Sequence, residues 1–290
     1  MKYSSLLFLI LLVISCSGSK KAIENASNSS RKMAIVANKK EDSIHISETK
    51  HTTEIPKEHQ ALENLKAVSE VEIHKDSIGI HKKWQDLLSL HVSENGLVDY
   101  KRFKTEQAKL KDYIALLGNT VPNDDWNKAS ILAYWINAYN AFTIDLILQN
   151  YPLKSIKEIK DPWQQRLWKL GEKWYNLDEI EHQILRKMDE PRIHFAIVCA
   201  SFSCPKLQNK AFLPSTLEEQ LTEATRQFLS DPERNIISAN TLELSKIFQW
   251  FAKDFKQNGS QIDFLNQYSD IEISNDAKIS FKKYNWDLNE

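Results

Sequence analysis

Side chains that can do chemistry are concentrated between Leu177 and Pro205, where the sequence reads LDEIEHQILRKMDEPRIHFAIVCASFSCP. The reactive positions in this segment are Glu181, His182, Arg186, His194, Cys199, Ser203 and Cys204. Together these residue types can supply a thiol nucleophile, a base, an acid that orients the base and a donor to an oxyanion. The segment therefore indicates where chemistry would occur, although it does not define a substrate.

A helix beginning at Asp178 is expected to carry the first of these residues. His182 and Arg186 are four residues apart and therefore share a face of that helix. Glu181 follows Asp178 by three residues, which is the spacing of a capping box. Its carboxylate therefore either accepts from the Asp178 backbone or acts beside His182, and a lone helical His is itself more often structural than catalytic.

A β-strand is predicted over residues 192–201, because this stretch is apolar on both faces as in a central strand. Alternation along a regular strand would place His194 and Cys199 on opposite faces. Cys199 would then be a small buried core thiol. Cys204 lies beyond the strand, where Pro205 favours an extended backbone and a loop that can present a reactive group.

A longer helix is predicted from about 125 to 150, since its apolar side chains recur at spacings of three and four. Asn137 and Asn140 share a face of this helix, and buried amides need hydrogen-bond partners. They orient a catalytic His or bind a substrate carbonyl, or else they hold the backbone of a neighbouring loop. Trp135 on the same helix is a further candidate for ligand binding.

The two downstream cysteines have three interpretations, of which the first is nucleophilic catalysis. His182 would be the base, Glu181 or Asn137 would orient it, and Ser203 or backbone amides would form an oxyanion hole. This is the set of groups used by papain-like and transglutaminase-like enzymes, whose sites need not keep one chain order. The expected reaction is acyl transfer through a thiol, such as amide hydrolysis.

The second interpretation is a disulfide between Cys199 and Cys204, which an oxidising compartment would favour. A disulfide would exclude a nucleophile in the resting protein. The third is a metal site formed by these cysteines with His182 and His194, but the spacings match no common zinc pattern. A disulfide or core role ranks first, a nucleophile second and a metal last, so neither a metal nor a cofactor is predicted.

The motifs around these residues resemble those of a known family. IEH-x-x-LR, PR-x-HFA and C-A-S-x-SCP follow one another in order, after the helical run YWINAYNAFT and before SKIFQWFAKDF and YNWDLN. This series is similar to the bacterial branch of the domain of unknown function 547 (DUF547) family. The resemblance covers roughly 84–290 and strengthens His182 as a site residue, but it implies no settled activity.

The first residues predict export and lipid anchoring. An apolar run from Leu6 to Ile14 is too short for a mature membrane span and is typical of a signal sequence. Residues 13–16 read VISC and resemble a bacterial lipobox, so residues 1–15 would be removed and Cys16 would carry the lipid. The alternative is an ordinary secretory signal that is cut elsewhere. The predicted location is the cell envelope, facing the periplasm or the cell surface, with the membrane as a partner through the lipid.

Composition divides the remaining chain into two parts. Residues 16–83 contain no aromatic side chain and read as a flexible polar tether, whereas all eight Trp residues lie at or after Trp84. Residues 84–290 are predicted to form a single α+β domain, with a helical layer packed on a small, mostly antiparallel sheet. A net charge of −1 without a basic run argues against a nucleic-acid partner, and no Gly-rich nucleotide loop is present.

Weaker patterns complete the expected fold. A hairpin is predicted around Gly171, and a capping box from Ser215 to Glu218 is expected to begin a helix. Further predicted elements are strands over 241–244 and 279–286 and a helix over 246–255. Function remains divided between an enzyme-like His/Cys cleft and a non-catalytic binding or scaffold module, with an unknown small molecule or peptide as its ligand.

Overall fold

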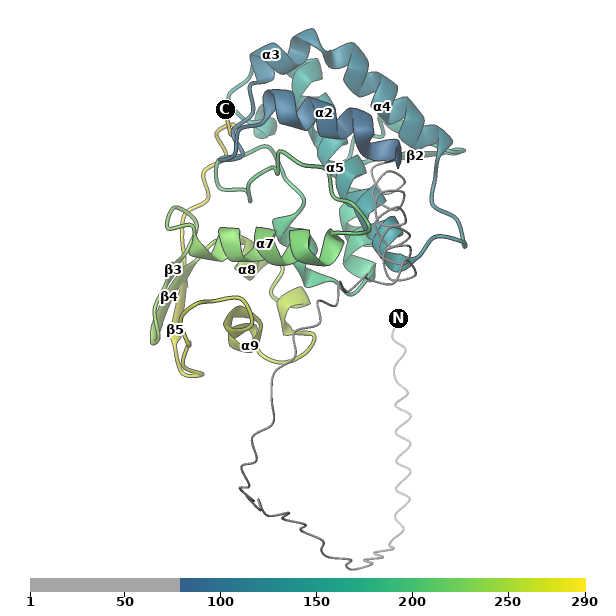
Figure 1. Cartoon of the computed structure of the whole chain (residues 1–290). Coiled ribbons are helices and arrows are strands. Elements are labelled where there is room, and N and C mark those ends of the chain that lie inside the picture. Colours follow the sequence, from purple (N-terminus) through teal and green to yellow (C-terminus); the bar gives the residue numbers. More distant parts are fainter. Residues whose placement is uncertain (1–78) are drawn as a thin grey trace, which may run out of the picture. The chain divides into compact units, whose positions relative to one another are not determined.

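The computed structural model describes residues 79–290 (Figure 1). The predicted signal peptide, the lipidation site Cys16 and the tether up to residue 78 lie outside the described residues. The described chain is an α+β fold, as predicted, and combines helices with one two-stranded and one three-stranded sheet. Its elements form two groups along the chain. The first ends near residue 158 and the second begins at residue 217, and a hairpin and several short helical turns connect them.

The first group is helical and is organised around one long buried helix, as Figure 1 shows. Its elements are η1 (Gly79–His81), α2 (Lys82–His91), α3 (Tyr100–Thr105), α4 (Gln107–Asn119), α5 (Lys128–Asn150) and η2 (Ile156–Glu158). Helix α5 confirms the prediction for 125–150. It begins where the Asn127 side chain accepts a hydrogen bond from the Ser130 amide at 2.9 Å, and it ends just before Pro152.

Helix α5 is the core of the domain. By length and composition alone it could cross a membrane, but 94% of its most apolar stretch is buried inside the protein. A helix that is apolar on all sides is stable only when it is surrounded, and helices α3 and α4 pack against it. The rigid, buried α5 therefore provides the support on which the neighbouring loops are fixed.

A hairpin and a short irregular helix follow α5. Strands β1 (Trp168–Leu170) and β2 (Lys173–Tyr175) pair antiparallel around Gly171, which confirms the predicted hairpin. The chain then continues as α6 (Leu177–Glu179), a π-helical turn η3 (Ile180–Ile184) and η4 (Leu185–Lys187). The predicted capping box is wrong, because Asn176 caps this helix by accepting from the Glu179 amide at 2.7 Å. Such π-helical turns occur frequently at functional sites.

The strand predicted over 192–201 is wrong. The chain instead forms a 3₁₀ helix, η5 (Pro191–Phe195), and then runs without regular structure to Ser201. Pro191 suits the first helical turn, and the Asn140 side chain bonds the backbone at 196 and 198, so no strand ladder is needed there. Residues 192–201 are largely apolar because they are buried on all sides, and not because they form a central strand of a sheet.

The second group of elements follows η5 and forms the other end of the domain (Figure 1). Its elements are α7 (Leu217–Ser230), β3 (Ile236–Ile237), β4 (Thr241–Leu244), α8 (Ile247–Trp250), η6 (Asp254–Lys256), α9 (Gln261–Asn266) and β5 (Lys278–Phe281). The sheet has the order β3-β4-β5, with β3 antiparallel and β5 parallel to β4. Phe195 from η5 lies in its apolar core against Phe228, Phe248, Phe255 and Phe264.

Several predicted boundaries in this second group need correction. Helix α7 begins at Leu217 without a side-chain cap, so the predicted capping box at Ser215 is wrong. The helix predicted over 246–255 is divided into α8 and η6 by a turn, and the last strand ends at Phe281 instead of Trp286. The strand at 241–244 is confirmed. The chain after Phe281 is thereby free to pass beside the loop that contains the cysteines.

Candidate functional site

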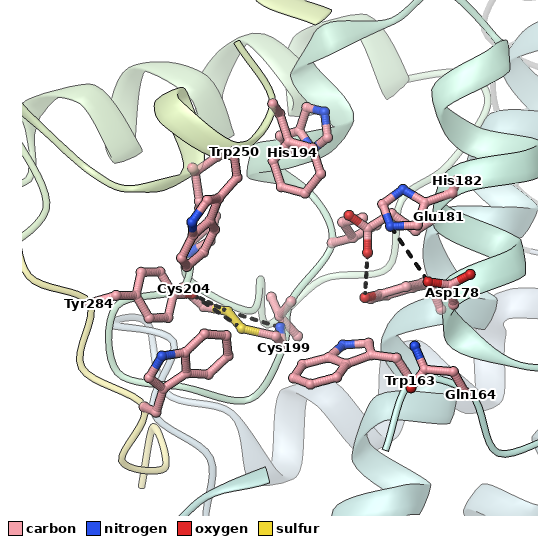
Figure 2. Close-up of a pocket in the computed structure, with 17 residues that line it drawn as sticks. Trp163, Gln164, Asp178, Glu181, His182, His194, Cys199, Cys204, Trp250 and Tyr284 are labelled. Atoms are coloured by element: carbon pink, nitrogen blue, oxygen red, sulfur yellow. Dashed lines mark hydrogen bonds and ion pairs between the residues drawn. A yellow bond between two sulfur atoms is a disulfide. The ribbon is translucent and has the colours of Figure 1, made fainter. Parts of the chain in front are cut away.

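A pocket of about 300 Å³ lies between the two groups of elements (Figure 2). Its polar lining comes mainly from α6 and η3, and its sulfur atoms come from the loop after η5. Figure 2 shows Cys199, Cys204 and Tyr284 on one side and Asp178, Glu181 and His182 on the opposite side. The incorrect strand prediction had separated His194 from Cys199, whereas in the structure both line this pocket.

Aromatic side chains form one continuous wall of the pocket. Tyr284 lies between Trp250 and Trp286, with ring centroids 4.8 Å and 4.6 Å away. Trp163 approaches Trp286 edge-on at 6.0 Å, from the segment that precedes β1. Trp250 is 48% exposed, so this wall opens to solvent at the pocket mouth. Exposed and mutually stacked rings of this kind are typical of ligand-binding surfaces.

The two cysteines form a disulfide in the pocket lining. Cys199 and Cys204 have Cα atoms 6.3 Å apart, and Cys199 is the more exposed of the two. The Tyr284 hydroxyl lies 3.2 Å from the Cys199 sulfur and 3.3 Å from the Cys204 sulfur. The Ser201 hydroxyl also lies within 3.4 Å of both sulfurs. In this state neither cysteine is a free thiol.

Two carboxylates occupy the opposite side of the pocket. Glu181 is almost completely buried, and its Oε2 accepts a hydrogen bond of 3.0 Å from the Tyr139 hydroxyl. Burial, together with the neighbouring Glu181 charge, raises the pKa of Tyr139 well above its usual value, so this hydroxyl stays protonated and donates. Asp178, one turn earlier, has a half-exposed side chain. The sequence alternative in which Glu181 caps Asp178 is not what the structure shows.

His182 and Arg186 form a contact whose direction follows from their chemistry. The distance between Arg186 Nη1 and His182 Nδ1 is 3.0 Å, and arginine can only donate. Nδ1 of His182 is therefore the acceptor, and the ring proton lies on Nε2. That nitrogen faces the Asp178 carboxylate at 3.7 Å. His182 is thus held between Arg186 and Asp178 rather than against a sulfur atom.

Asp254 links His194 to Arg186, the partner of His182, and it was not among the residues predicted from the sequence. Its carboxylate accepts from Arg186 Nε at 2.6 Å and Nη2 at 2.8 Å, and lies 2.8 Å from His194 Nε2. Burial alone would raise the pKa of Asp254, but the hydrogen bonds from Arg186 and His194 hold it well below its usual range. His194 also stacks on Phe251, with ring centroids 4.0 Å apart.

Comparison with known proteins places part of this chain in a family. Residues 123–229 match the family model described as "Protein of unknown function, DUF547". The chain contains a DUF547 domain. No curated protein and no solved structure matches the chain.

The residues matched to DUF547 supply only part of the pocket. Glu181, His182 and both linked cysteines lie within the match, whereas Trp250, Tyr284, Trp286 and Asp254 follow it. The aromatic wall and the carboxylate that binds His194 therefore come mainly from the chain that follows the DUF547 match. The motif SKIFQWFAKDF contains Asp254, and its position in that motif, directly before Phe255, was the only sequence signal for it.

The remaining predicted site residues of the DUF547 domain do not line the pocket. Asn137 donates to the Phe212 carbonyl at 2.7 Å and accepts from the Phe212 amide at 3.0 Å. Asn140 bonds the Ala196 carbonyl and the Val198 amide. Both side-chain amides therefore bind the backbone of neighbouring loops, which is the second of the two roles predicted for them.

Trp135, Arg186 and Ser203 also have contacts outside the pocket lining. Trp135 packs on Tyr175 with centroids 5.3 Å apart, and the Ser203 hydroxyl accepts from the Asn285 amide at 2.8 Å. Arg186 does not line the pocket but contacts two residues that do, His182 through a hydrogen bond and Phe251 through its ring face. Within the described part of the chain, no three His, Cys, Asp or Glu side chains are grouped so that they could hold a metal ion.

Proposed function

We propose that this domain is a binding module whose pocket takes a small organic cation, an ammonium group above all. The observation that carries the proposal is the aromatic wall formed by Trp250, Tyr284 and Trp286, which faces the carboxylates Asp178 and Glu181 across one cavity. Aromatic faces attract cations, and carboxylates add an opposite charge at short range.

A contact already present on the same wall supports this choice. The Lys157 ammonium lies over the Trp286 ring, 4.1 Å from its centroid. That contact is a cation–π pair, and it shows the chemistry that the wall offers to a positive group. The two pocket carboxylates would repel an anionic ligand from the opposite side.

The alternative function is acyl transfer through a thiol, with His182 as base. It requires a thiolate, but Cys199 and Cys204 are joined to each other. His182 is bonded to Arg186 and faces Asp178, and residues 79–290 contain no hydrogen bond between its ring and a cysteine sulfur. The pocket therefore supports binding better than nucleophilic catalysis in this state.

Replacement of Trp250 by Ala is expected to weaken binding of an ammonium probe about threefold to fivefold, the size of one cation–π contact at a half-exposed ring. Titration calorimetry with choline would measure this, together with 3,3-dimethylbutan-1-ol, which has the same shape without the charge. The neutral probe should bind wild type at least about tenfold more weakly than choline. Trp174→Ala removes an equally exposed Trp outside the pocket and should leave the affinity unchanged.

Glu181→Gln separates the role of charge from that of shape. It keeps an acceptor for the Tyr139 hydroxyl and should weaken choline binding without affecting the neutral probe. Equal affinity for the two probes, or no binding of choline by wild type, would overturn the proposal.

We further propose that a lipid on Cys16 anchors the protein to a bacterial envelope membrane, facing the periplasm or the cell surface. The VISC sequence after a short apolar run supports this location. Cys16→Ala should abolish incorporation of a labelled fatty acid and move the protein from the membrane to the soluble fraction. Cleavage at another position with no lipid attached would show an ordinary secretory signal instead.

A further inference from the structure

The loop that contains the disulfide is held in place by contacts other than the disulfide. The Phe202 amide donates to the Asp287 carbonyl at 2.7 Å, and the Ser203 amide donates to the Asn285 carbonyl at 3.2 Å. Ser201 forms a β-bridge with Leu288. The C-terminal segment therefore fixes this loop along its length, whether or not the sulfurs are joined.

Arg234 fixes the other side of the same loop. Its guanidinium donates to the carbonyl oxygens of Phe202 and Cys204, and its plane lies over the Phe202 ring. Since Cys199 and Cys204 are only five positions apart, the disulfide closes a short loop and removes less entropy from the unfolded chain than a cross-link over a longer loop would. Because other contacts also fix this loop, its stability alone does not account for a disulfide that lines a pocket.

The two sulfur atoms have different surroundings. Cys204 is buried and its sulfur alone accepts the Cys199 amide, at 2.9 Å, whereas the Ser201 and Tyr284 hydroxyls lie near both sulfurs. Burial raises the pKa of Tyr284 to about 12, so its hydroxyl is a donor at neutral pH. Cys199 is the more exposed sulfur. The pair thus offers one sulfur to attack and one that is prepared to leave as a thiolate.

We propose that Cys199 and Cys204 form a thiol–disulfide exchange site that accepts electrons from a peptide dithiol. One peptide thiolate attacks the Cys199 sulfur, and the electron pair of the broken S–S bond passes to Cys204. The second peptide thiolate then attacks the peptide sulfur of this mixed disulfide and releases Cys199. The peptide is oxidised by two electrons to a disulfide, and its two thiol protons end on Cys199 and Cys204.

A peptide fits this site better than a small thiol does. The pocket beside the disulfide has room for a side chain next to the attacking sulfur, and its aromatic wall provides apolar contact. Within the aromatic wall, Tyr284 also contacts the reacting sulfurs directly. The proposal does not depend on cation binding, because the bonds that form and break are those of Cys199 and Cys204, neither of which is assigned to the cation; Tyr284 is the one residue that both proposals use.

The asymmetry of the two sulfurs gives a direct test in full-length protein that carries Cys16→Ser. Each cysteine in turn is replaced by Ser, and the remaining thiol is offered an excess of two synthetic one-cysteine peptides joined by a disulfide, so that attack releases one peptide as a free thiol. Cys204→Ser leaves Cys199, the more exposed of the two sulfurs, and should accumulate a mixed disulfide, because no second protein thiol can resolve it. Cys199→Ser should form at least about tenfold less adduct, since Cys204 is buried. Intact-mass spectrometry reads both results.

The parent protein should be reduced by a peptide dithiol while it stays folded, as near-ultraviolet circular dichroism would show. Tyr284→Phe should slow that reduction about tenfold, the effect of one hydrogen bond to a charged group. It should also raise the pH at which Cys204 is alkylated in the Cys199→Ser protein. Tyr268→Phe is the matched control and should change neither quantity.

Two outcomes would overturn the exchange site. One is equal or absent mixed-disulfide formation by the two single-cysteine variants. The other is reduction of the parent protein only under denaturing conditions, which would make the disulfide purely structural. Choline affinity measured on the same samples separates this result from cation binding, because either property can fail while the other persists.

Discussion

Replacement of Asp254 by alanine is expected to lower the free energy of unfolding by about 3 kcal/mol, because it removes one partner of a largely buried charge network. Arg186 would lose both hydrogen bonds to this carboxylate, and His194 would lose the partner of its Nε2. Each group left behind is too enclosed to regain full hydration. Urea unfolding followed by circular dichroism would measure the change.

Two variants make this prediction specific. Asp270→Ala removes an exposed aspartate in the same half of the domain, so its effect should stay within about 0.5 kcal/mol. Asp254→Asn keeps the shape of the side chain and one acceptor oxygen, so its free energy of unfolding should lie between those of wild type and Asp254→Ala. A loss below about 1 kcal/mol for Asp254→Ala would mean that water replaces the carboxylate and that the network does not stabilise the fold.

The same carboxylate gives a pH dependence with a defined sign. The hydrogen bonds from Arg186 and His194 hold the pKa of Asp254 below its usual value, so the folded state favours the ionised form. The resulting stability is fully present above the ordinary Asp pKa of about 4 and is lost as pH falls through the lower folded-state pKa. The difference in stability between wild type and Asp254→Ala should therefore be constant near neutrality and should narrow below about pH 4.

The sequence predicted secondary structure best where an element carries a local signal of its own. Helix α5 and the β1–β2 hairpin carry local signals, namely three-and-four spacing and a Gly at the turn, and both were predicted. The segment 192–201 lacks such a signal, because an apolar run without periodicity describes burial equally well in a strand or an irregular chain. Only the tertiary contact from Asn140 decides between them.

The candidate site was predictable in part for the same reason. Glu181, His182 and the two cysteines are reactive residue types close together in sequence, and all of them line one pocket. Asp254 and Tyr284 come from segments at least 50 residues further on, and no local pattern indicates that they return to this place. Long-range packing brings them there, and a single sequence contains no measure of it.

Two neighbouring segments of the pocket wall are fixed in place by different contacts. Its sulfur side is fixed by the C-terminal segment and Arg234, whereas the backbone between His194 and Cys199 is attached to α5. The Asn140 side-chain amide provides the hydrogen bonds that a neighbouring strand would otherwise provide to this backbone. Its removal should therefore destabilise the backbone beside the pocket as well as cost two hydrogen bonds. Asn140 is the residue on which this expectation can be tested.

Asn140→Ala is expected to cost about 3 kcal/mol of unfolding free energy. The side chain is 1% exposed, donates to the Ala196 carbonyl at 2.9 Å and accepts from the Val198 amide at 3.0 Å. Its removal leaves two buried backbone groups without partners, each costing about 1–3 kcal/mol, and a small cavity besides. Asn150→Ala, an exposed Asn at the end of the same helix, should cost less than about 0.5 kcal/mol.

Hydrogen exchange would show whether the effect spreads to the pocket. In wild type the Val198 amide should be strongly protected by its bond to Asn140, and in Asn140→Ala its exchange should approach that of an exposed loop. Amides of α7, which do not contact Asn140, should change only in proportion to global stability. If Val198 stays protected in the variant, the backbone beside the pocket is held by its apolar packing, and Asn140 contributes to stability without determining the shape of the site.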